Sequence, residues 1–270
     1  MSDSVTTLFG SKQRTPTCVK YPRGMVAMFS TASPFKRSPN EDCYAVIPLN
    51  KETLILAVAD GAGGHPNGGM AARLVIEAVV KEVTLPGKRP VRESIVNGFD
   101  AGQAAIVTQV PGAATTLIVV EITNRSARTY HVGDSGACVI GGRGKVKSYT
   151  IFHSPTGYAA EAGMLTEQQA MMHEHRHVVS NLMGDAEMSV EIGQPLLLAA
   201  RDTIVVASDG LFDNLLRDEI GAISCRGPLA DAGQNLIAAA TARMKDVDPD
   251  EPGKADDLTI LMYRQHHGQC

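Results

Sequence analysis

The sequence predicts an α+β protein in which helices cover a sandwich of antiparallel sheets. Short runs of β-branched residues follow one another closely between residues 115 and 151, separated by turn signals at 123–124 and 141–142. This spacing is typical of an antiparallel meander. Helical patterns lie both between and after the strand groups, an order that favours helices packed outside the sheets. No internal repeat, low-complexity stretch or linker divides the chain.

The composition is that of a globular protein with a large core. The chain has 270 residues, of which 44% are hydrophobic and 20% charged, and its net charge is −4. This charge argues against nucleic acid or an anionic membrane as the main partner. No apolar run approaches the roughly 18 residues that a membrane span requires. Five cysteines without C-x-x-C spacing indicate free thiols in a reducing compartment, so we expect a cytoplasmic protein, and we expect a monomer.

The elements can be predicted in chain order. Residues 1–22 are polar and contain two prolines, which indicates a loosely packed N-terminal tail. The last five residues, HHGQC, are expected to fray. The predicted strands lie at 24–31, 43–47, 54–59, 115–122, 127–132, 137–140, 146–151, 188–198 and 204–208 and after residue 256, and the predicted helices lie at about 68–84, 91–110, 211–223 and 229–244.

The segment from residue 54 to 73 is the clearest candidate for a functional site. A continuous apolar run of strand length ends on Asp60, and a glycine-rich loop then begins at Gly61. Glycines allow a tight turn and bring bare backbone close to a ligand. From Met70 the apolar positions recur at helical spacing. The unit is therefore a strand, an acidic glycine loop and a helix.

An aspartate next to an apolar run occurs three more times in the sequence. Residues 129–135 read TYHVGDS and end on Asp134, residues 204–210 read IVVASDG and contain Asp209, and Asp256 precedes the last apolar run. Four carboxylates gathered in one place repel one another unless a cation lies among them, and hard oxygen ligands suit Mg²⁺ or Mn²⁺. The alternative is four unrelated turns at the surface, and the sequence order leaves that alternative open.

The ordered series of motifs resembles the metal-dependent protein phosphatase family, protein phosphatase 2C, in its bacterial form. The resemblance implies a four-layer α-β-β-α sandwich with two central antiparallel sheets. It also implies a single phosphatase domain over residues 23–265, with a flap at about 152–185. The matching segments are RSPNED at 37–42, VADGAGGH at 58–65, GAATT at 112–116, HVGDS at 131–135, residues 163–185, ASDGLF at 207–212 and Asp256 with Asp257.

The resemblance implies hydrolysis of phosphoserine and phosphothreonine in proteins by water activated between two Mn²⁺ or Mg²⁺ ions. Asp60 would bridge the pair, with the Gly61 carbonyl on one ion and Asp209 and Asp256 on the other. Asp134 would complete a third, weaker site beside Asp209. The implied partners are phosphoproteins that a serine/threonine kinase has modified.

The segment 37–42 is implied to serve the phosphate and the metal-bound water. Arg37 stands where the family uses an arginine to grip the substrate phosphate, a role that suits a planar guanidinium with paired donors. On spacing alone, a solvated loop arginine is the alternative. Lys36 is interpreted as an ordinary surface charge. Glu41 and Asp42 resemble the carboxylates that hold metal-bound waters.

The chain departs from the family pattern at two positions. Ala62 stands where many eukaryotic relatives carry the histidine proposed as general acid, a group typically worth about 10²–10⁴ in rate. His65 is a candidate proton donor, although a residue at a helix entry can also serve only in packing or hydrogen bonding. Gly136 stands where relatives usually carry an arginine, which would alter the third metal site or the flap.

Two further groups of polar residues have a simpler interpretation. His173, His175 and His177 alternate within the flap, and a polar flap surface is favoured over a metal site made of them. The acids of residues 246–255, DVDPDEPGKA, indicate a solvated surface turn.

Two other functions compete with the phosphatase. A non-catalytic member of the same fold would bind phosphoproteins without hydrolysis, but the intact acids at Asp60, Asp209 and Asp256 argue against it. A Mg²⁺-dependent nucleotide hydrolase would need a phosphate-binding loop, and the chain has no G-x-x-x-x-G-K-[ST] sequence.

Overall fold

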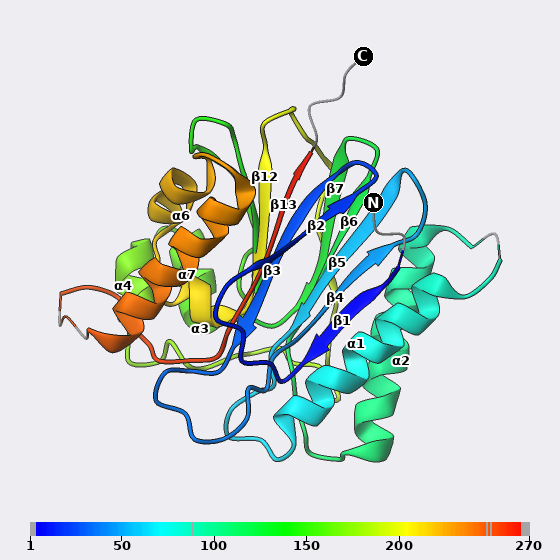
Figure 1. Cartoon of the computed structure of the whole chain (residues 1–270). Coiled ribbons are helices and arrows are strands. Elements are labelled where there is room, and N and C mark those ends of the chain that lie inside the picture. Colours follow the sequence, from blue (N-terminus) through cyan, green and yellow to red (C-terminus); the bar gives the residue numbers. More distant parts are fainter. Residues whose placement is uncertain (1–3, 88, 247, 249, 266–270) are drawn as a thin grey trace.

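Two antiparallel β-sheets lie face to face, and helices cover both outer faces (Figure 1). The computed structural model describes residues 4–87, 89–246, 248 and 250–265. Four layers result, in the order α-β-β-α, and this order confirms the predicted fold class.

The first sheet carries the strand that ends on Asp60. Its β5 (Thr53–Ala59) is buried along its whole length, because helices cover one face and the second sheet covers the other. The strands follow one another in the order β1 (Thr6–Phe9), β4 (Cys43–Pro48), β5, β6 (Leu117–Thr123), β7 (Ser126–Val132) and β10 (Glu191–Ile192), with β11 (Leu196–Leu197) also paired to β7.

The second sheet carries the strands next to Asp134, Asp209 and Asp256. Its central strand β12 (Thr203–Ala207) is fully buried and pairs with strands on both sides. The strand order is β2 (Thr17–Tyr21), β3 (Gly24–Thr31), β13 (Leu258–Gln265), β12, β8 (Gly136–Ile140) and β9 (Val146–Tyr149).

Helices α1 (Gly68–Thr84) and α2 (Val91–Gln109) cover the first sheet, and α6 (Arg217–Ser224) and α7 (Leu229–Lys245) cover the second. A one-turn helix, α5 (Asp209–Phe212), follows β12 directly. Helices α3 (Pro155–Glu161) and α4 (Glu167–Met171) lie within the predicted flap. Among the described residues, no helix combines the length and apolar character that crossing a bilayer demands.

The core has three layers, because successive side chains on each strand point to opposite faces of the sheet. On β5, Ile55 and Ala57 pack toward α1 and α2, whereas Leu56 and Val58 pack between the two sheets. A third cluster lies between the second sheet and α7. Because apolar side chains fill these layers, the polar side chains available for chemistry lie at the strand ends.

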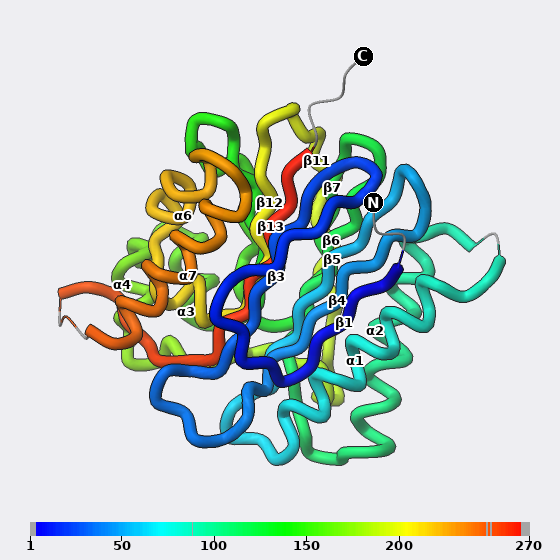
Figure 2. Tube along the Cα trace, in the orientation of Figure 1, coloured from blue at the N-terminus to red at the C-terminus, as the bar shows by residue number. Residues whose placement is uncertain are grey.

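The expectation of a loosely packed tail over residues 1–22 is wrong from Thr6 onward. Strand β1 pairs with β4, and β2 pairs with β3, so this segment contributes a strand to each sheet (Figure 2). Both are edge strands, whose backbone groups pair on one side while most side chains stay partly exposed. A polar segment can therefore be a strand without a long apolar run.

Two predicted elements are shorter than expected. The strand at 188–198 reduces to β10 and β11, because Gly193 and Pro195 interrupt it and proline has no N–H to donate. The helix at 211–223 divides into α5 and α6 near Leu216, whose N–H donates to the Glu219 side chain at the start of α6. The terminal HHGQC lies outside the described residues.

Candidate metal centre

The acidic strand ends meet at one end of the sandwich, where they line a common cavity of about 470 Å³. Asp60 follows β5, Asp134 lies between β7 and β8, Asp209 opens α5, and Asp256 precedes β13. The sequence placed each of them at the end of a strand, and the structure brings all four together. Also in the cavity wall are Lys36, Glu41, Gly61, Ala62, Gly63, His65, Thr116, His177, Val178, Val179, Leu182, Lys254 and Asp257.

The GAATT segment holds the backbone of Asp60. The Asp60 N–H donates to Thr116 Oγ1 at 3.0 Å, and its carbonyl accepts from the Thr116 N–H at 2.9 Å and from Thr115 Oγ1 at 2.7 Å. Thr116 Oγ1 also lies 2.7 Å from the Ser135 hydroxyl, next to Asp134. These threonines therefore fix the position of one carboxylate relative to another, a role that the sequence motif alone did not reveal.

Two glycines allow the acidic loops to come close. A Cβ atom on Gly61 would lie 2.4 Å from the carbonyl carbon of Gly68, and one on Gly210 would lie 2.0 Å from the Asp257 carbonyl oxygen. Neither space admits a side chain. Contact between Gly210 and Asp257 brings the loop of Asp209 against the loop of Asp256.

The carboxylates repel one another inside a poorly solvated site. Burial, followed by the neighbouring acids Asp42 and Asp209, raises the pKa of Asp60 well above its ordinary value. Burial and Asp209 raise the pKa of Asp134 to about 8, and they raise that of Asp256 to about 6. Such shifts follow when charged groups lack enough compensating positive charge. The site therefore favours a bound cation.

Two buried carboxylate oxygens have no hydrogen-bond partner among the described residues: Oδ1 of Asp209 and Oδ1 of Asp42. The other oxygen of Asp42 accepts from the Ser208 hydroxyl at 2.9 Å. Leaving a buried charged acceptor without a partner is costly, so each exception needs an explanation. For Asp209, which lines the cavity, a hard divalent cation supplies one, since the cavity's acidic side chains offer the oxygen ligands that Mg²⁺ and Mn²⁺ prefer. The residues present thus fit the implied metal ions.

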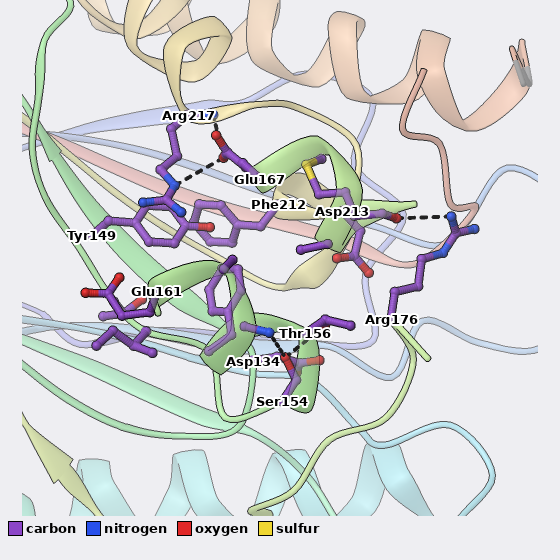
Figure 3. Close-up of a pocket in the computed structure, with 17 residues that line it drawn as sticks. Asp134, Tyr149, Ser154, Thr156, Glu161, Glu167, Arg176, Phe212, Asp213 and Arg217 are labelled. Carbon is purple, nitrogen blue, oxygen red and sulfur yellow. Dashed lines mark hydrogen bonds and ion pairs between the residues drawn. The ribbon is translucent and has the colours of Figure 1, made fainter. Parts of the chain in front are cut away.

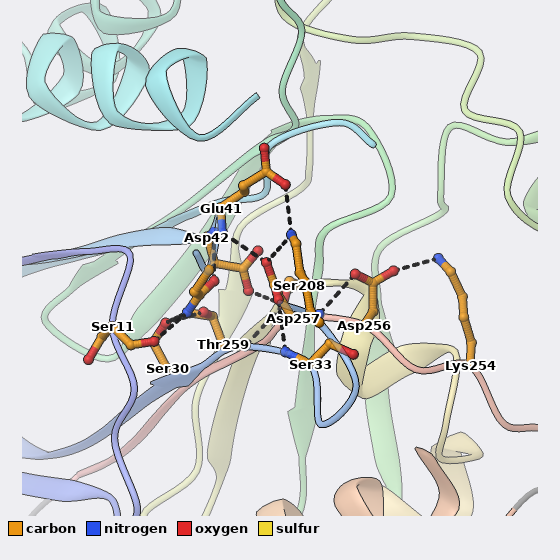
Figure 4. A network of polar contacts seen from close by, with 12 residues as sticks. Ser11, Ser30, Ser33, Glu41, Asp42, Ser208, Lys254, Asp256, Asp257 and Thr259 are labelled. Atoms are coloured by element: carbon orange, nitrogen blue, oxygen red, sulfur yellow. Dashed lines mark hydrogen bonds and ion pairs between the residues drawn. The ribbon is translucent and has the colours of Figure 1, made fainter. Parts of the chain in front are cut away.

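Lys36 is not an ordinary surface charge, and that interpretation is wrong. Its ammonium group donates to Glu41 Oε2 at 2.7 Å and to Asp257 Oδ2 at 2.8 Å. Asp257 is buried and also accepts from the Ser33 N–H at 2.9 Å, a contact visible in Figure 4. A buried carboxylate requires a paired cation, and Lys36 provides it.

Arg37 has a different environment from its neighbour. It is exposed, it does not line the cavity, and it makes no hydrogen bond or ion pair with any residue that the structure describes. Its guanidinium is therefore available to a ligand.

The Glu41 carboxylate accepts a hydrogen bond from Lys36, whereas Asp42 is fully buried behind the cavity wall.

The loop at 246–255 is not only a solvated turn, because Lys254 at its end enters the cavity. Its ammonium group contacts Asp209, Asp213 and Asp256. Asp213, a partly buried acid that shares the Lys254 ammonium with Asp209, was missed in the sequence, since it follows α5 rather than a strand. The acids of this loop predicted a solvated turn, but its lysine reaches the cavity.

The two departures from the family pattern have structural counterparts. His65 lines the cavity, and its Nδ1 lies 3.3 Å from the Gly112 carbonyl oxygen. Because a carbonyl oxygen only accepts hydrogen bonds, Nδ1 of His65 carries the proton and Nε2 does not.

A Cβ atom on Gly136 would lie 2.5 Å from both the Phe152 ring and Thr150 Oγ1. The space that an arginine would enter is already filled.

Among the described residues, the three flap histidines are not brought together as a group of ligand-type side chains. His177 lines the cavity, while the His175 N–H donates to His173 Nδ1 at 3.1 Å on the flap surface. Within the described ranges, the one trio of ligand-type side chains with atoms all within 4.8 Å of one another is elsewhere: His131, His153 and Glu191. The cavity aspartates are spaced more widely, as ligands that enclose two ions must be.

Three of the four ring nitrogens of the His131–His153 pair have a polar partner, whereas His131 Nδ1 is buried without one among the described residues. The Gly133 N–H donates to His153 Nδ1 at 3.1 Å, so the proton of that ring is on Nε2, which lies 3.3 Å from Glu191 Oε2. His131 Nε2 donates to the Ile151 carbonyl at 2.9 Å, and the two rings stack with centroids 4.4 Å apart. Burial lowers the pKa of His131, which keeps it neutral. We interpret the pair as a structural unit.

A second, smaller cavity of about 60 Å³ lies between the flap and the second sheet (Figure 3). The Arg217 guanidinium lies 4.4 Å from the centroid of the Tyr149 ring and pairs with Glu167 of α4 at 3.2 Å. Asp134 lies at one side of this cavity. The flap is thus attached next to the acidic site.

A carboxylate cavity at the edge of an α-β-β-α sandwich defines the class of metal-dependent phosphatases. The sequence model described as Protein phosphatase 2C matches residues 35–243. The chain therefore belongs to the protein phosphatase 2C family. This confirms the predicted family and, with it, metal-dependent hydrolysis of phosphoserine and phosphothreonine; binding without hydrolysis is not favoured.

Similar proteins agree with this assignment. Protein phosphatase PhpP of Streptococcus pneumoniae is 26% identical over 239 residues, which cover 84% of this chain and 92% of that protein. Serine/threonine phosphatase stp of Listeria monocytogenes is 25% identical over 255 residues, covering 89% and 96%. The S. agalactiae serine/threonine phosphatase structure superposes with a TM-score of 0.73 at 25% identity, covering 88% of this chain and 98% of that one. The catalytic domain of PstP, solved with two manganese ions, has the same fold, with a TM-score of 0.71 at 22% identity and coverage of 90% and 98%.

Proposed function

We propose that this chain hydrolyses phosphoserine and phosphothreonine in proteins at a binuclear centre held by Asp60, the Gly61 carbonyl, Asp209 and Asp256. One observation carries the assignment of residues. Aspartates from three separate strand ends line one cavity, and a buried oxygen of Asp209 has no partner among the described residues. When bound, Mn²⁺ or Mg²⁺ ions lower the pKa of a bound water and neutralise charge on the phosphoryl oxygens.

The protein groups around the centre orient the reacting molecules. Thr115 and Thr116 hold the backbone of Asp60, which would keep its carboxylate in place to hold a metal ion. We infer that Glu41, which lines the cavity, accepts a hydrogen bond from water there. Asp42 is fully buried and does not line the cavity, so it would act indirectly, through the Ser208 hydroxyl that donates to it next to Asp209.

We assign phosphate binding to Arg37. Its guanidinium is exposed and unpaired among the described residues, while the adjacent Lys36 is held by two carboxylates at the cavity. A free guanidinium can donate two parallel hydrogen bonds to a phosphate dianion, which a committed lysine cannot. Substrate binding would draw Arg37 toward the cavity mouth.

We assign His65 the role of proton donor to the departing serine or threonine oxygen, in place of the histidine that Ala62 replaces. Its Nδ1–H is held by the Gly112 carbonyl, so transfer would occur from Nε2 of the protonated ring. His65 lines the same cavity as the aspartates, which places it within reach of a bound phosphoester.

The wider biological setting follows from the same chemistry. The substrates are phosphoproteins, and a serine/threonine kinase supplies them. We infer a monomer acting in the cytoplasm, where its cysteines stay as thiols; Cys18, Cys43, Cys138 and Cys225 are free in the part of the chain that the structure describes. We infer that residues 152–185, with α3 and α4, form the flap of a single domain that begins at about Thr6 rather than at residue 23, because β1 and β2 pair into its two sheets, and that extends to residue 265.

Hydrolysis of a phosphothreonine peptide by the purified chain in Mn²⁺ tests the proposal. Asp209→Asn should lose most of the activity, whereas the matched control Asp218→Asn, an exposed acid on α6, should retain it. Removing the metal with EDTA should abolish turnover, and adding Mn²⁺ should restore it. Turnover that survives in Asp209→Asn would refute the assignment of the centre.

A further inference from the structure

The side chain of Lys254 lies among the acids of the metal centre. Its ammonium group contacts Oδ2 of Asp209, Oδ2 of Asp213 at 3.0 Å and Oδ2 of Asp256 at 3.2 Å. Figure 4 shows the contact with Asp256. The lysine side chain is only 21% exposed. An ammonium group has three N–H donors, and here three carboxylates accept them.

The backbone holds Lys254 in this position. The Lys254 N–H donates to Asn214 Oδ1 at 2.9 Å, and its carbonyl accepts from Asn214 Nδ2 at 2.8 Å. Asn214 is fully buried, and its Nδ2 also donates to the Gly210 carbonyl at 3.0 Å. The lysine is therefore fixed to the same segment that carries Asp209 and Asp213.

The Lys254 ammonium lies beside the acids that were expected to hold a third metal ion, since it contacts Asp209 directly and shares a cavity with Asp134. Asp134 and Asp209 were the expected ligands of that ion, and both line the cavity with Lys254. Asp213 lines the neighbouring small cavity together with Asp134, so the two acids flank the same region. A positive charge is already present where the third ion would supply one.

The two oxygens of Asp209 divide between two cations. Oδ2 is bound by Lys254, whereas Oδ1 is buried without a partner among the described residues. Lys254 therefore leaves one Asp209 oxygen for the pair of ions that Asp60 bridges. Similarly, Lys254 contacts Oδ2 of Asp256, and Oδ1 of Asp256 accepts a hydrogen bond from the Asp257 N–H at 2.8 Å.

We propose that Lys254 is a built-in cation that takes the place of the third metal ion, so that this centre binds two divalent ions. The proposal rests on the proposed function, since it assumes the binuclear centre. A tethered ammonium is present at every turnover, whereas a weakly held ion depends on its concentration in solution. It would also hold the flap side of the centre in place without an added ligand.

Native mass spectrometry of the full chain during titration with Mn²⁺ tests the proposal. The wild type should saturate at two ions, and Lys254→Gln should gain a third, because Asp134, Asp209 and Asp213 are then left without their cation. The matched control is Lys147→Gln, which removes another lysine paired with a buried acid, Asp202 at 2.7 Å, away from the cavity. That control should still bind two ions.

Each other outcome has a meaning. Three ions or one ion in the wild type, or two in Lys254→Gln, would overturn the role of Lys254. No bound ion in the wild type would instead refute the proposed function. If Lys254→Gln does not fold, the NMR signal of the Lys254 ammonium in the wild type decides. Saturating Mg²⁺ should leave this signal protected from exchange with water, and its loss would show that a metal displaces the lysine.

Discussion

The aspartate cavity and the His131–His153 pair are both clusters of side chains that can bind metals, and each holds one buried atom without a partner among the described residues, yet they differ in how much negative charge they gather. In the cavity, a buried oxygen of Asp209 has no partner among the described residues, and the pKa of Asp134 is raised to about 8 by burial and by Asp209. At the histidine pair, backbone groups already fix the protonation of both rings. The residues at the pair are closer together, but the cavity has the greater need for a cation.

The difference teaches that proximity of ligand atoms is a weaker sign of a metal site than uncompensated charge. The His131, His153 and Glu191 atoms lie within 4.8 Å of one another, whereas no aspartate trio does so in the described chain. The histidine cluster holds one carboxylate, that of Glu191, which already lies 3.3 Å from His153 Nε2, so it has little negative charge for an ion to compensate. Buried carboxylates that repel one another gain much from an ion.

Neutralising Asp60 should give the largest effect. Asp60→Asn removes the bridging charge, and loss of metal stabilisation worth about 4 kcal/mol in the transition state lowers kcat/KM roughly 10³-fold. Hydrolysis of an aryl phosphate in Mn²⁺ measures it. A loss of less than about tenfold would mean that Asp60 does not bridge the ions.

The metal should stabilise the fold more at high pH than at low pH. Burial and neighbouring acids raise the folded-state pKa of Asp42 and Asp134 to about 8 and that of Asp213 and Asp256 to about 6. An acid whose pKa is raised in the folded state adds its full stabilisation at pH values below its unfolded-state pKa, which is near 4. That stabilisation is lost as the pH rises through the folded-state pKa values of about 6 and about 8.

Thermal unfolding between pH 5 and 9 measures this dependence. In EDTA, Tm should fall across that range as the acids ionise. One fixed Mn²⁺ concentration, equal to 100 times the Kd at pH 8.5, adds about 2.7 kcal/mol at that pH, which corresponds to a rise in Tm of roughly 5–10 °C. The rise should be larger at pH 8.5 than at pH 5.5. A metal effect that is equal at both pH values would contradict the electrostatic account.

Thr116→Val should disturb the cavity indirectly. It removes the acceptor of the Asp60 N–H, and an unpaired buried donor costs about 1–3 kcal/mol of unfolding free energy. Urea denaturation and Mn²⁺ titration should both report the loss. Thr116→Ser keeps the hydroxyl and should behave like the wild type. If valine and serine act alike, the hydrogen bond to Asp60 does not matter.

Arg37→Ala should weaken substrate binding more than catalysis by the metal. Loss of one charge-assisted contact to phosphate, worth about 1.5 kcal/mol, raises KM for a phosphopeptide roughly tenfold. Metal affinity should not change. The control is Arg92→Ala, an exposed arginine on α2, away from the cavity. Equal KM values for wild type and Arg37→Ala would remove Arg37 from the site.

Glu191→Gln should have the smallest effect, within about twofold in kcat/KM, because it retains an acceptor oxygen for His153 Nε2. Mn²⁺ stoichiometry should also stay the same. A lost metal ion in Glu191→Gln would assign an ion to the histidine pair and would reverse the comparison.

The sequence predicted the parts of the site that depend on local pattern. Asp60 and Asp209 were found because each ends a continuous apolar run, and that run became a fully buried strand. The helices over residues 68–84 and 229–244 were found from their apolar spacing and agree with α1 and α7. Strand ends and amphipathic helices are visible in sequence because neighbours along the chain determine them.

The parts that were missed depend on contacts between distant segments. Lys36 meets Asp257 across 221 residues, and Lys254 meets Asp209 across 45. Nothing near either lysine in sequence marks it as the partner of a buried acid. The edge strands β1 and β2 were missed for a related reason, because a sheet edge requires pairing but little burial.

Anomalous diffraction from crystals grown with Mn²⁺ tests the central claim most directly. We predict two manganese peaks with Asp60 between them, one of them also bound by Asp209 and Asp256, and no peak at His131 and His153. A peak at the histidine pair with none beside Asp60 would contradict the account.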